Sequence, residues 1–233
     1  MPPDTPNITL YQLNGTCAFA AHALLLHLSI PFTRIRMTRS DSGLFTSSDG
    51  SFDTAWYKSN IHHLGLVPAL VVDGKTLTEN PAVLSYIAGL KPERNLLGRS
   101  EWEKAKVLEW MVWLSGMLHG QGVAAFLRPH RFTDEESAFE GVKKKALEKV
   151  MGCLETIEAR VEGQHAVGDE VTIVDFFLHV IWRWAGNMKV DRAKYARFGV
   201  VVRNVERLEG VRRALEAEEL ELQFPEGEKQ ASL

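Results

Sequence analysis

Cys17 is the residue whose type and surroundings point most directly to chemistry. A turn, Asn14-Gly15-Thr16, follows the β-rich run Ile8–Leu13 and leads into residues 17–28, whose alanine and leucine content favours a helix. We therefore expect Cys17 at a helix N-terminus, where unpaired N–H groups and the helix dipole lower the pKa of a thiol. A thiolate there would be a nucleophile. The position of Cys17 alone is equally consistent with a small buried core residue.

The second cysteine, Cys153, does not suggest a redox partner for the first. It repeats with Ala146, Val150 and Ile157 along one helix face, which predicts a place in the core. Two cysteines allow at most one disulfide, and the segment Ala18-Phe19-Ala20 excludes a Cys-x-x-Cys pair at Cys17.

The composition limits the classes of function. The chain has 233 residues, 45% of them hydrophobic and 24% charged, which is typical of a globular protein of one or two domains. The formal net charge is -3 and no basic run stands apart from acidic residues, so we expect no nucleic-acid partner. Asp175 and His179 interrupt the apolar stretch 171–182, and residues 1–7 lack the features of a signal peptide. These observations predict a cytoplasmic protein with no membrane partner.

Residues 8–90 alternate between strand and helix patterns. After the first strand, further strands are expected at Phe32–Met37, parallel to the first, and in a hairpin around the turn Asp73-Gly74 that joins Pro68–Val72 to Lys75–Thr78. Residues 38–54 are rich in Ser, Asp, Gly and Thr and are predicted to form a loop. The pattern predicts a small four-stranded mixed sheet with helices on its faces, which is a thioredoxin-like α/β arrangement.

The helix that follows the hairpin begins at Asn80-Pro81 and is expected to end near Ala88. Asn is a preferred N-cap, and proline is tolerated at the first helical position because its missing N–H has no partner there. From Lys91 the composition changes. We predict an N-terminal extension over 1–7, an α/β domain over 8–90, a linker over 91–97, an all-α helical domain over 98–223 and a tail over 224–233.

Several helices are predicted in this second domain. Residues 100–118 can place Leu108, Val112, Ser115 and His119 on one face, residues 172–185 read as a buried helix, and residues 204–222 read as one charged helix. Thr172 and Asp175 are predicted to form a capping box that serves folding and not catalysis. His119 lies between Gly116 and Gly120, which would leave room for a ligand, and by position alone it reads as an ordinary surface histidine.

Four ordered motifs resemble the glutathione S-transferases, with the bacterial beta class the nearest in pattern. Residues 10–22 are similar to the segment in which a glycine, a small residue and a cysteine precede the first helix. Residues 64–70 resemble the family's G-x-V-P-A-L segment, whose proline is cis. Residues 77–80 stand where the family has an acidic–small pair, and residues 167–175 are similar to its G-D-x-x-[ST]-x-x-D motif. The segment 61–65 is closer to a form found in fungal relatives.

The resemblance implies glutathione as cosubstrate and no metal. It implies that Cys17, His119 and Tyr11 are catalytic, with Asn14 and Thr16 as other groups near the sulfur. It implies that the glutathione-binding residues are Thr16, Val67, Pro68, Glu79 and Asn80. In this reading the Val67 backbone pairs with the peptide, Glu79 takes the ammonium of glutathione, and Asn80 with the helix N-terminus takes the adjacent carboxylate.

The implied function is a cytoplasmic, homodimeric glutathione S-transferase. It would activate the glutathione thiol for conjugation to a hydrophobic electrophile, or for thiol exchange or tailoring of a fungal secondary metabolite. Two alternatives stay open at this point. One is a non-catalytic binding or regulatory protein of the same fold, and the other is a glutathione-dependent reductase that works through Cys17.

Overall fold

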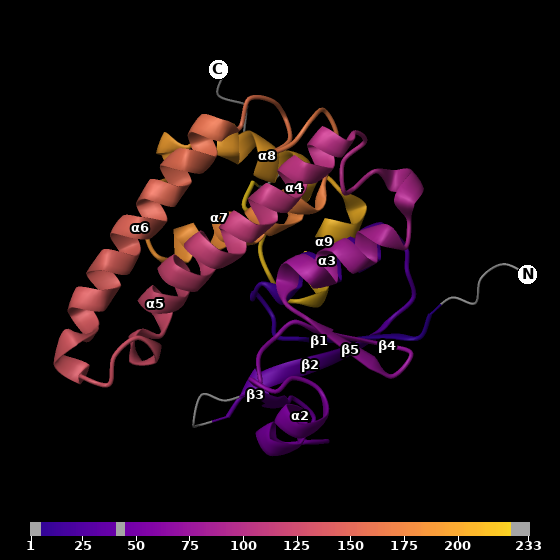
Figure 1. Cartoon of the computed structure of the whole chain (residues 1–233), viewed down its shortest axis with the longest axis vertical. Helices are drawn as coiled ribbons and strands as arrows, with labels where there is room; N and C mark the ends of the chain where they lie inside the picture. The colour runs from indigo at the N-terminus through magenta and orange to yellow at the C-terminus, as the bar shows by residue number, and fades with distance from the viewer. Residues whose placement is uncertain (1–5, 41–44, 225–233) are drawn as a thin grey trace, which may run out of the picture. The chain divides into compact units, whose positions relative to one another are not determined.

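The computed structural model describes residues 6–40 and 45–224 (Figure 1). The chain forms two compact units within these ranges. One contains the residues up to Arg94 together with those from Glu206 onward, and the other runs from Asn95 to Val205. Most of the predicted N-terminal extension and tail, and part of the predicted loop 38–54, lie outside the described residues.

The first unit is built on a mixed sheet. Its elements are β1 (Ile8–Gln12), α1 (Ala18–His27), β2 (Thr33–Arg39), β3 (Phe45–Ser47), α2 (Thr54–Asn60), β4 (Ala69–Val72), β5 (Lys75–Thr78) and α3 (Asn80–Gly89). The strand order is β3-β2-β1-β4-β5, and β1 pairs in parallel with β2 while the other pairs are antiparallel. Asp73 and Gly74 both have positive φ, as a tight hairpin turn requires, so the predicted hairpin and parallel pair are confirmed.

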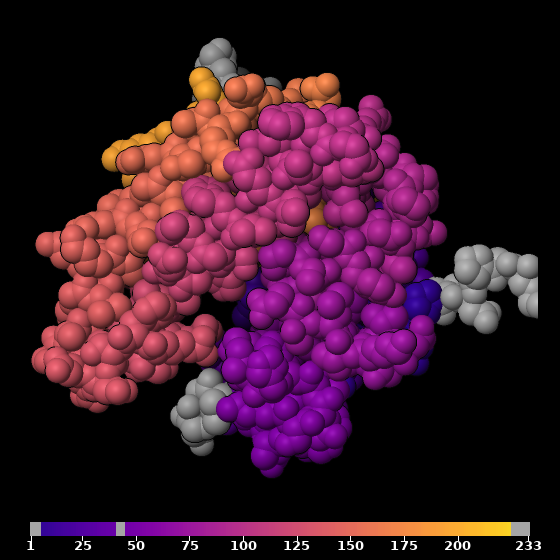
Figure 2. All heavy atoms as spheres, viewed as in Figure 1, coloured from indigo at the N-terminus to yellow at the C-terminus, as the bar shows by residue number. Residues whose placement is uncertain are grey.

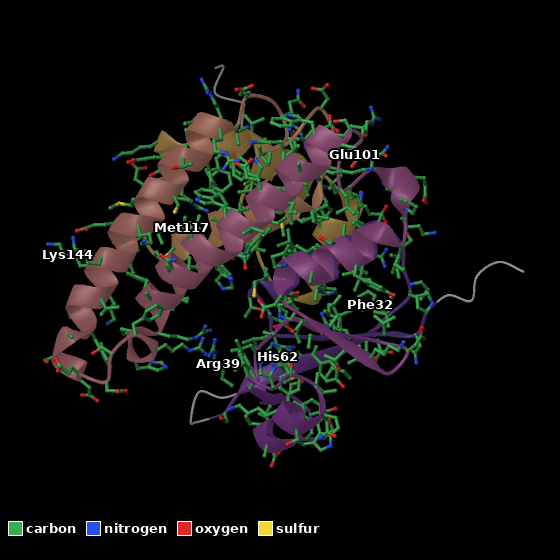
Figure 3. All side chains as sticks on the ribbon, viewed as in Figure 1. Phe32, Arg39, His62, Glu101, Met117 and Lys144 are labelled. Carbon is green, nitrogen blue, oxygen red and sulfur yellow. The ribbon has the colours of Figure 1, made fainter. Side chains whose placement is uncertain are left out.

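The prediction of four strands is wrong, because the sheet has five among the described residues. The additional strand, β3, lies inside the segment whose composition predicted a loop. Phe45 is buried there and its ring lies 4.8 Å from the guanidinium carbon of Arg39, which is labelled in Figure 3. The hydroxyls of Thr46 and Ser47 both donate to the Phe52 carbonyl. Side-chain hydrogen bonds therefore stabilise a short strand that the sequence does not mark with an apolar alternation.

The second unit is helical, as expected. Its main helices are α4 (Glu101–Trp113), the π-helix η2 (Leu114–Val123), α5 (Ala124–Leu127), α6 (Phe139–Arg160), α7 (Ile173–Asn187) and α8 (Ala196–Glu206). The α6 face formed by Ala146, Val150, Cys153 and Ile157 is buried, and burial raises the pKa of the Cys153 thiol. Helix α7 is buried nearly all round, so both of these predictions are confirmed.

The face predicted for residues 100–118 is wrong. Leu108 and Val112 are 62% and 60% exposed, and the buried stripe runs instead through Val107, Met111, Leu114 and Leu118. The reason is that both stripes have helical spacing, and only packing selects between them. The π-helix then changes the rotation per residue from Leu114 onward, so His119 no longer follows from the α-helical pattern.

The predicted single helix over 204–222 is also wrong. A break after Glu206 separates α8 from α9 (Glu209–Ala217), and α9 packs against α1 of the first unit. The contact is close at Gly210, where a Cβ atom would lie 2.2 Å from the backbone nitrogen of His27. Only glycine allows the two helices this approach.

The predicted capping box at the start of α7 is confirmed. One oxygen of Asp175 accepts from the Thr172 N–H at 2.7 Å and from the Thr172 hydroxyl at 2.9 Å, and the other accepts from the Ala166 N–H at 2.8 Å. Asp175 is fully buried, so its carboxylate serves the fold.

We expect Asp175→Ala to lower the free energy of unfolding by roughly 3 kcal/mol, because it leaves buried N–H and O–H donors without an acceptor. Urea unfolding followed by tryptophan fluorescence measures the change. Asp169→Ala, at an exposed position six residues earlier, is the matched control and should leave stability nearly unchanged. Equal stability of the two variants would contradict the assigned role.

Candidate functional site

Cys17 lies at the N-terminus of α1, where the sequence places it. It is the N-cap residue of this helix and is buried. The preceding turn is closed by a hydrogen bond from the Thr16 N–H to the Leu13 carbonyl, and Gly15 supplies the positive φ that the turn needs. The end of β1 therefore delivers the sulfur to the helix start, next to the N–H groups that favour a thiolate.

The segment before β4 lies beside this sulfur. The Cys17 thiol donates to the Val67 carbonyl at 3.4 Å, and the Val67-Pro68 peptide bond is cis. Val67 precedes Ala69, the first residue of β4 that pairs with β1. The structure thus brings together Cys17 and Val67, which stand fifty residues apart in the chain.

The N-terminus of α3 carries the two residues expected to bind the glutamyl end of glutathione. Glu79 is exposed, has φ of 69°, and is itself the N-cap, whereas Asn80 is the first helical residue. The expectation that Asn80 is the N-cap is therefore wrong by one position. The side chain of Asn80 is 5% exposed, and neither its Oδ1 nor its Nδ2 has a hydrogen-bond partner among the described residues. An amide without partners is costly, and it is a group that a ligand can satisfy.

Tyr11 and Thr16, the other residues expected near the sulfur, have different surroundings. The Tyr11 ring is part of the core, at 5.5 Å from the ring of Tyr57 and 6.0 Å from that of Phe52, and burial raises the pKa of its phenol. It is thus a hydroxyl donor and not a phenolate at neutral pH. The Thr16 hydroxyl donates to the Leu13 carbonyl at 2.7 Å and so supports the turn.

His119 belongs to the second unit and lies in η2. Its ring is 4.9 Å from the ring of Trp184 and 6.1 Å from that of Phe177, both on α7. Burial lowers its pKa to about 4, and the charges of Arg128 and Arg131 act in the same direction. The imidazole is therefore neutral at physiological pH, and can accept or donate a hydrogen bond as a neutral group.

A buried pair that the sequence did not indicate joins α1 to the residue after α9. His22 Nδ1 is 2.8 Å from a carboxylate oxygen of Glu218, and the other oxygen accepts from the Gly15 N–H at 2.8 Å. The partners are 196 residues apart, so no local pattern could have announced the contact. The one sequence signal was His22 itself, a polar residue among the apolar residues of α1.

The described residues form neither a membrane-spanning helix nor a metal site. Across residues 6–40 and 45–224, no helix combines the length and apolar character needed to cross a membrane. In the same part of the chain no three His, Cys, Asp or Glu side chains come together as a metal site.

The two units define a class of protein, in which a thioredoxin-like α/β domain with a cis-proline segment is joined to an all-α domain. The glutathione S-transferase C-terminal domain family matches residues 117–209. A glutathione S-transferase of Xanthomonas campestris is 28% identical over 218 residues, which cover 91% of this chain and 98% of that protein.

Solved structures agree with these relatives. A beta-class glutathione S-transferase of Sphingomonas chungbukensis is 25% identical with a TM-score of 0.78, over 91% of this chain and all of that one. A sphingomonad glutathione S-transferase in complex with glutathione is 26% identical with a TM-score of 0.76, over 91% of this chain and 100% of that one. Over most of its length the chain is therefore similar to glutathione S-transferases, and a beta-class-like assignment is compatible with these likenesses.

The lowered pKa of His119 gives a direct pH prediction. Because the unfolded chain binds this proton near pH 6.5 and the folded chain only near pH 4, the stability contributed by the neutral ring is complete above pH 6.5 and is lost as the pH falls toward 4. An NMR titration of the imidazole, assigned with a His119→Gln variant, should give a midpoint near 4. A midpoint near 6.5 would show that the ring is hydrated and not packed on α7.

Proposed function

We propose that this protein binds glutathione on its first unit and activates the glutathione thiol for transfer to a hydrophobic electrophile or for thiol exchange through Cys17. The observation that carries the proposal is the Cys17 sulfur at the start of α1, 3.4 Å from the Val67 carbonyl. A sulfur at this point is near helical N–H groups that favour an anion and beside a backbone segment that a peptide can pair with.

The backbone of glutathione is the part that Val67 would recognise. Val67 and Pro68 directly precede β4, and we propose that the Val67 N–H and C=O pair with the cysteinyl unit of the tripeptide as a short added strand. Its carbonyl holds the Cys17 thiol proton in the free protein. Pairing with glutathione would replace this contact and leave Cys17 beside the incoming sulfur.

The glutamyl end of glutathione fits the start of α3. Its carboxylate would accept from Asn80 Nδ2 and from backbone N–H groups of the first helical turn, and its ammonium would face the exposed carboxylate of Glu79. The unsatisfied amide of Asn80 supports this placement, because the bound carboxylate supplies the missing acceptor.

The remaining assignments follow from chemistry and family resemblance. Tyr11 and Thr16 are proposed to donate hydrogen bonds near the sulfur, and neutral His119 is proposed to contact the electrophile. We further propose a homodimer in the cytoplasm and a hydrophobic second substrate, in detoxification or in the tailoring of a secondary metabolite, with no metal.

Oxidised glutathione tests Cys17 directly. The Cys17 thiolate attacks one sulfur of the disulfide, the old S–S bond breaks, a new one forms on Cys17, and one glutathione thiolate leaves. We expect intact-mass spectrometry to show one adduct on the natural protein and on Cys153→Ser, and none on Cys17→Ser. Cys153 is buried in the core of the second unit and is the matched control. An adduct that persists in Cys17→Ser would contradict the proposal.

Asn80→Ala should weaken the binding of reduced glutathione about tenfold, since one hydrogen bond to a charged group is lost. The unliganded variant should be as stable as the natural protein or more so, because the substitution removes a buried amide without partners. Calorimetric titration and thermal unfolding measure the two effects, with Glu93→Ala as an exposed control. Unchanged affinity in Asn80→Ala would remove Asn80 from the site.

A further inference from the structure

The residues after α9 form a segment that is tied into the first unit. Glu218 immediately follows the helix and is 1% exposed. Its carboxylate accepts from the Gly15 N–H at 2.8 Å and contacts His22 Nδ1 at 2.8 Å, and its backbone carbonyl accepts from Asn14 Nδ2 at 2.9 Å. Two of these contacts reach the loop between β1 and α1, at Asn14 and Gly15, and the third reaches His22 in α1.

The chemistry of the buried pair assigns its hydrogen. A carboxylate oxygen accepts hydrogen bonds, so we assign the 2.8 Å contact as a hydrogen bond that the His22 Nδ1–H donates to Glu218. His22 is 2% exposed, and the centroid of its ring lies 5.7 Å from that of Phe32 in an edge-to-face arrangement; Figure 3 labels Phe32. Packing and the hydrogen bond therefore hold the His22 ring in one orientation, and the ring fixes the Glu218 carboxylate in turn.

The short loop transmits this anchoring to Cys17. Gly15, which Glu218 holds, is two residues before Cys17, and Thr16 between them is bonded to Leu13 through both its N–H and its hydroxyl. The loop is left with little freedom to move the sulfur relative to the start of α1. The contact with Val67 adds a second fixed point for the sulfur.

The segment that carries Glu218 is itself fixed on both sides. Before it, Gly210 lies against the backbone of His27, and the Ala217 carbonyl accepts from Arg34 at 3.0 Å. After it, the carboxylate of Glu206 accepts from the N–H groups of Gln223 and Phe224. Glu218 therefore acts from a rigid position.

We propose that Glu218 is a positioning residue for Cys17, acting through the Gly15 N–H and through His22. Its hydrogen bonds to the loop and to α1 go to Asn14, Gly15 and His22, none of which is proposed to bind glutathione. This inference rests on the proposed role of Cys17. It predicts that loss of Glu218 slows the chemistry of the thiol and leaves the affinity for reduced glutathione nearly unchanged.

The test compares Glu218→Ala, Glu218→Gln and Glu219→Gln. In each, the rates of Cys17 alkylation by iodoacetamide and of exchange with oxidised glutathione are measured against pH. We expect Glu218→Ala to react about tenfold more slowly at neutral pH, because the half-buried Gly15 N–H and the buried His22 lose their partner and the loop loses its anchor. Glu218→Gln keeps a carbonyl oxygen for the Gly15 N–H, and its amide N–H can donate to His22 Nδ1 once the ring proton moves to Nε2, so most of the rate should return. Glu219, whose side chain is 74% exposed, is the neighbouring control and should not change it.

A second pair of variants, at His22, tests the inference if Glu218→Ala does not fold. In His22→Asn the amide nitrogen can stand in for Nδ1 and donate to Glu218, whereas His22→Ala cannot, so the alanine variant should react more slowly than the asparagine variant. Circular dichroism checks folding. A folded Glu218→Ala or His22→Ala protein with the natural rate and pH profile would overturn the inference.

The two probes separate this inference from the proposed function. If the natural protein forms no glutathione adduct, the proposed function fails, while iodoacetamide still reports whether Glu218 controls the reactivity of the Cys17 sulfur. If the adduct forms at the same rate in every folded variant, only the positioning role of Glu218 fails.

Discussion

The site depends on where the loop between β1 and α1 ends, because this point fixes the first turn of α1 and the sulfur of Cys17. Strand β1 lies in the middle of the sheet, paired with β2 on one side and β4 on the other. Its end therefore cannot shift without disturbing both neighbours. The Glu218 carboxylate accepts a hydrogen bond from the Gly15 N–H of this loop. The Val67 carbonyl accepts a hydrogen bond from the Cys17 thiol.

The same constraint explains why α9 belongs with the first unit although it follows the helical unit in sequence. Figure 2 gives the space-filling view of the chain, with the C-terminal helices in orange to yellow. The glycine contact of α9 with α1 allows Glu218 to reach the loop. A structural element at the end of the chain thus completes a site formed near its beginning.

Much of the first unit was predictable because its signals are local. The helix start at Cys17, the Asp73-Gly74 hairpin and the parallel pairing of β1 with β2 each follow from a few adjacent residues. Local signals also led to errors. Two stripes on α4 have helical spacing, and spacing alone does not separate the exposed one from the buried one. Strand β3 was missed because hydroxyl hydrogen bonds, and not apolar alternation, hold it.

The fold class, the capping box of α7 and the place of Cys17 at a helix start follow from local patterns, since backbone propensity and capping act over a few residues. Three other features depend on tertiary packing: the Glu218–His22 pair, the π-helical turn that carries His119, and the burial of the Asn80 amide with no partner among the described residues. Each of these depends on which distant groups are packed together. Desolvation and hydrogen bonding act through space, and sequence spacing does not encode such neighbours.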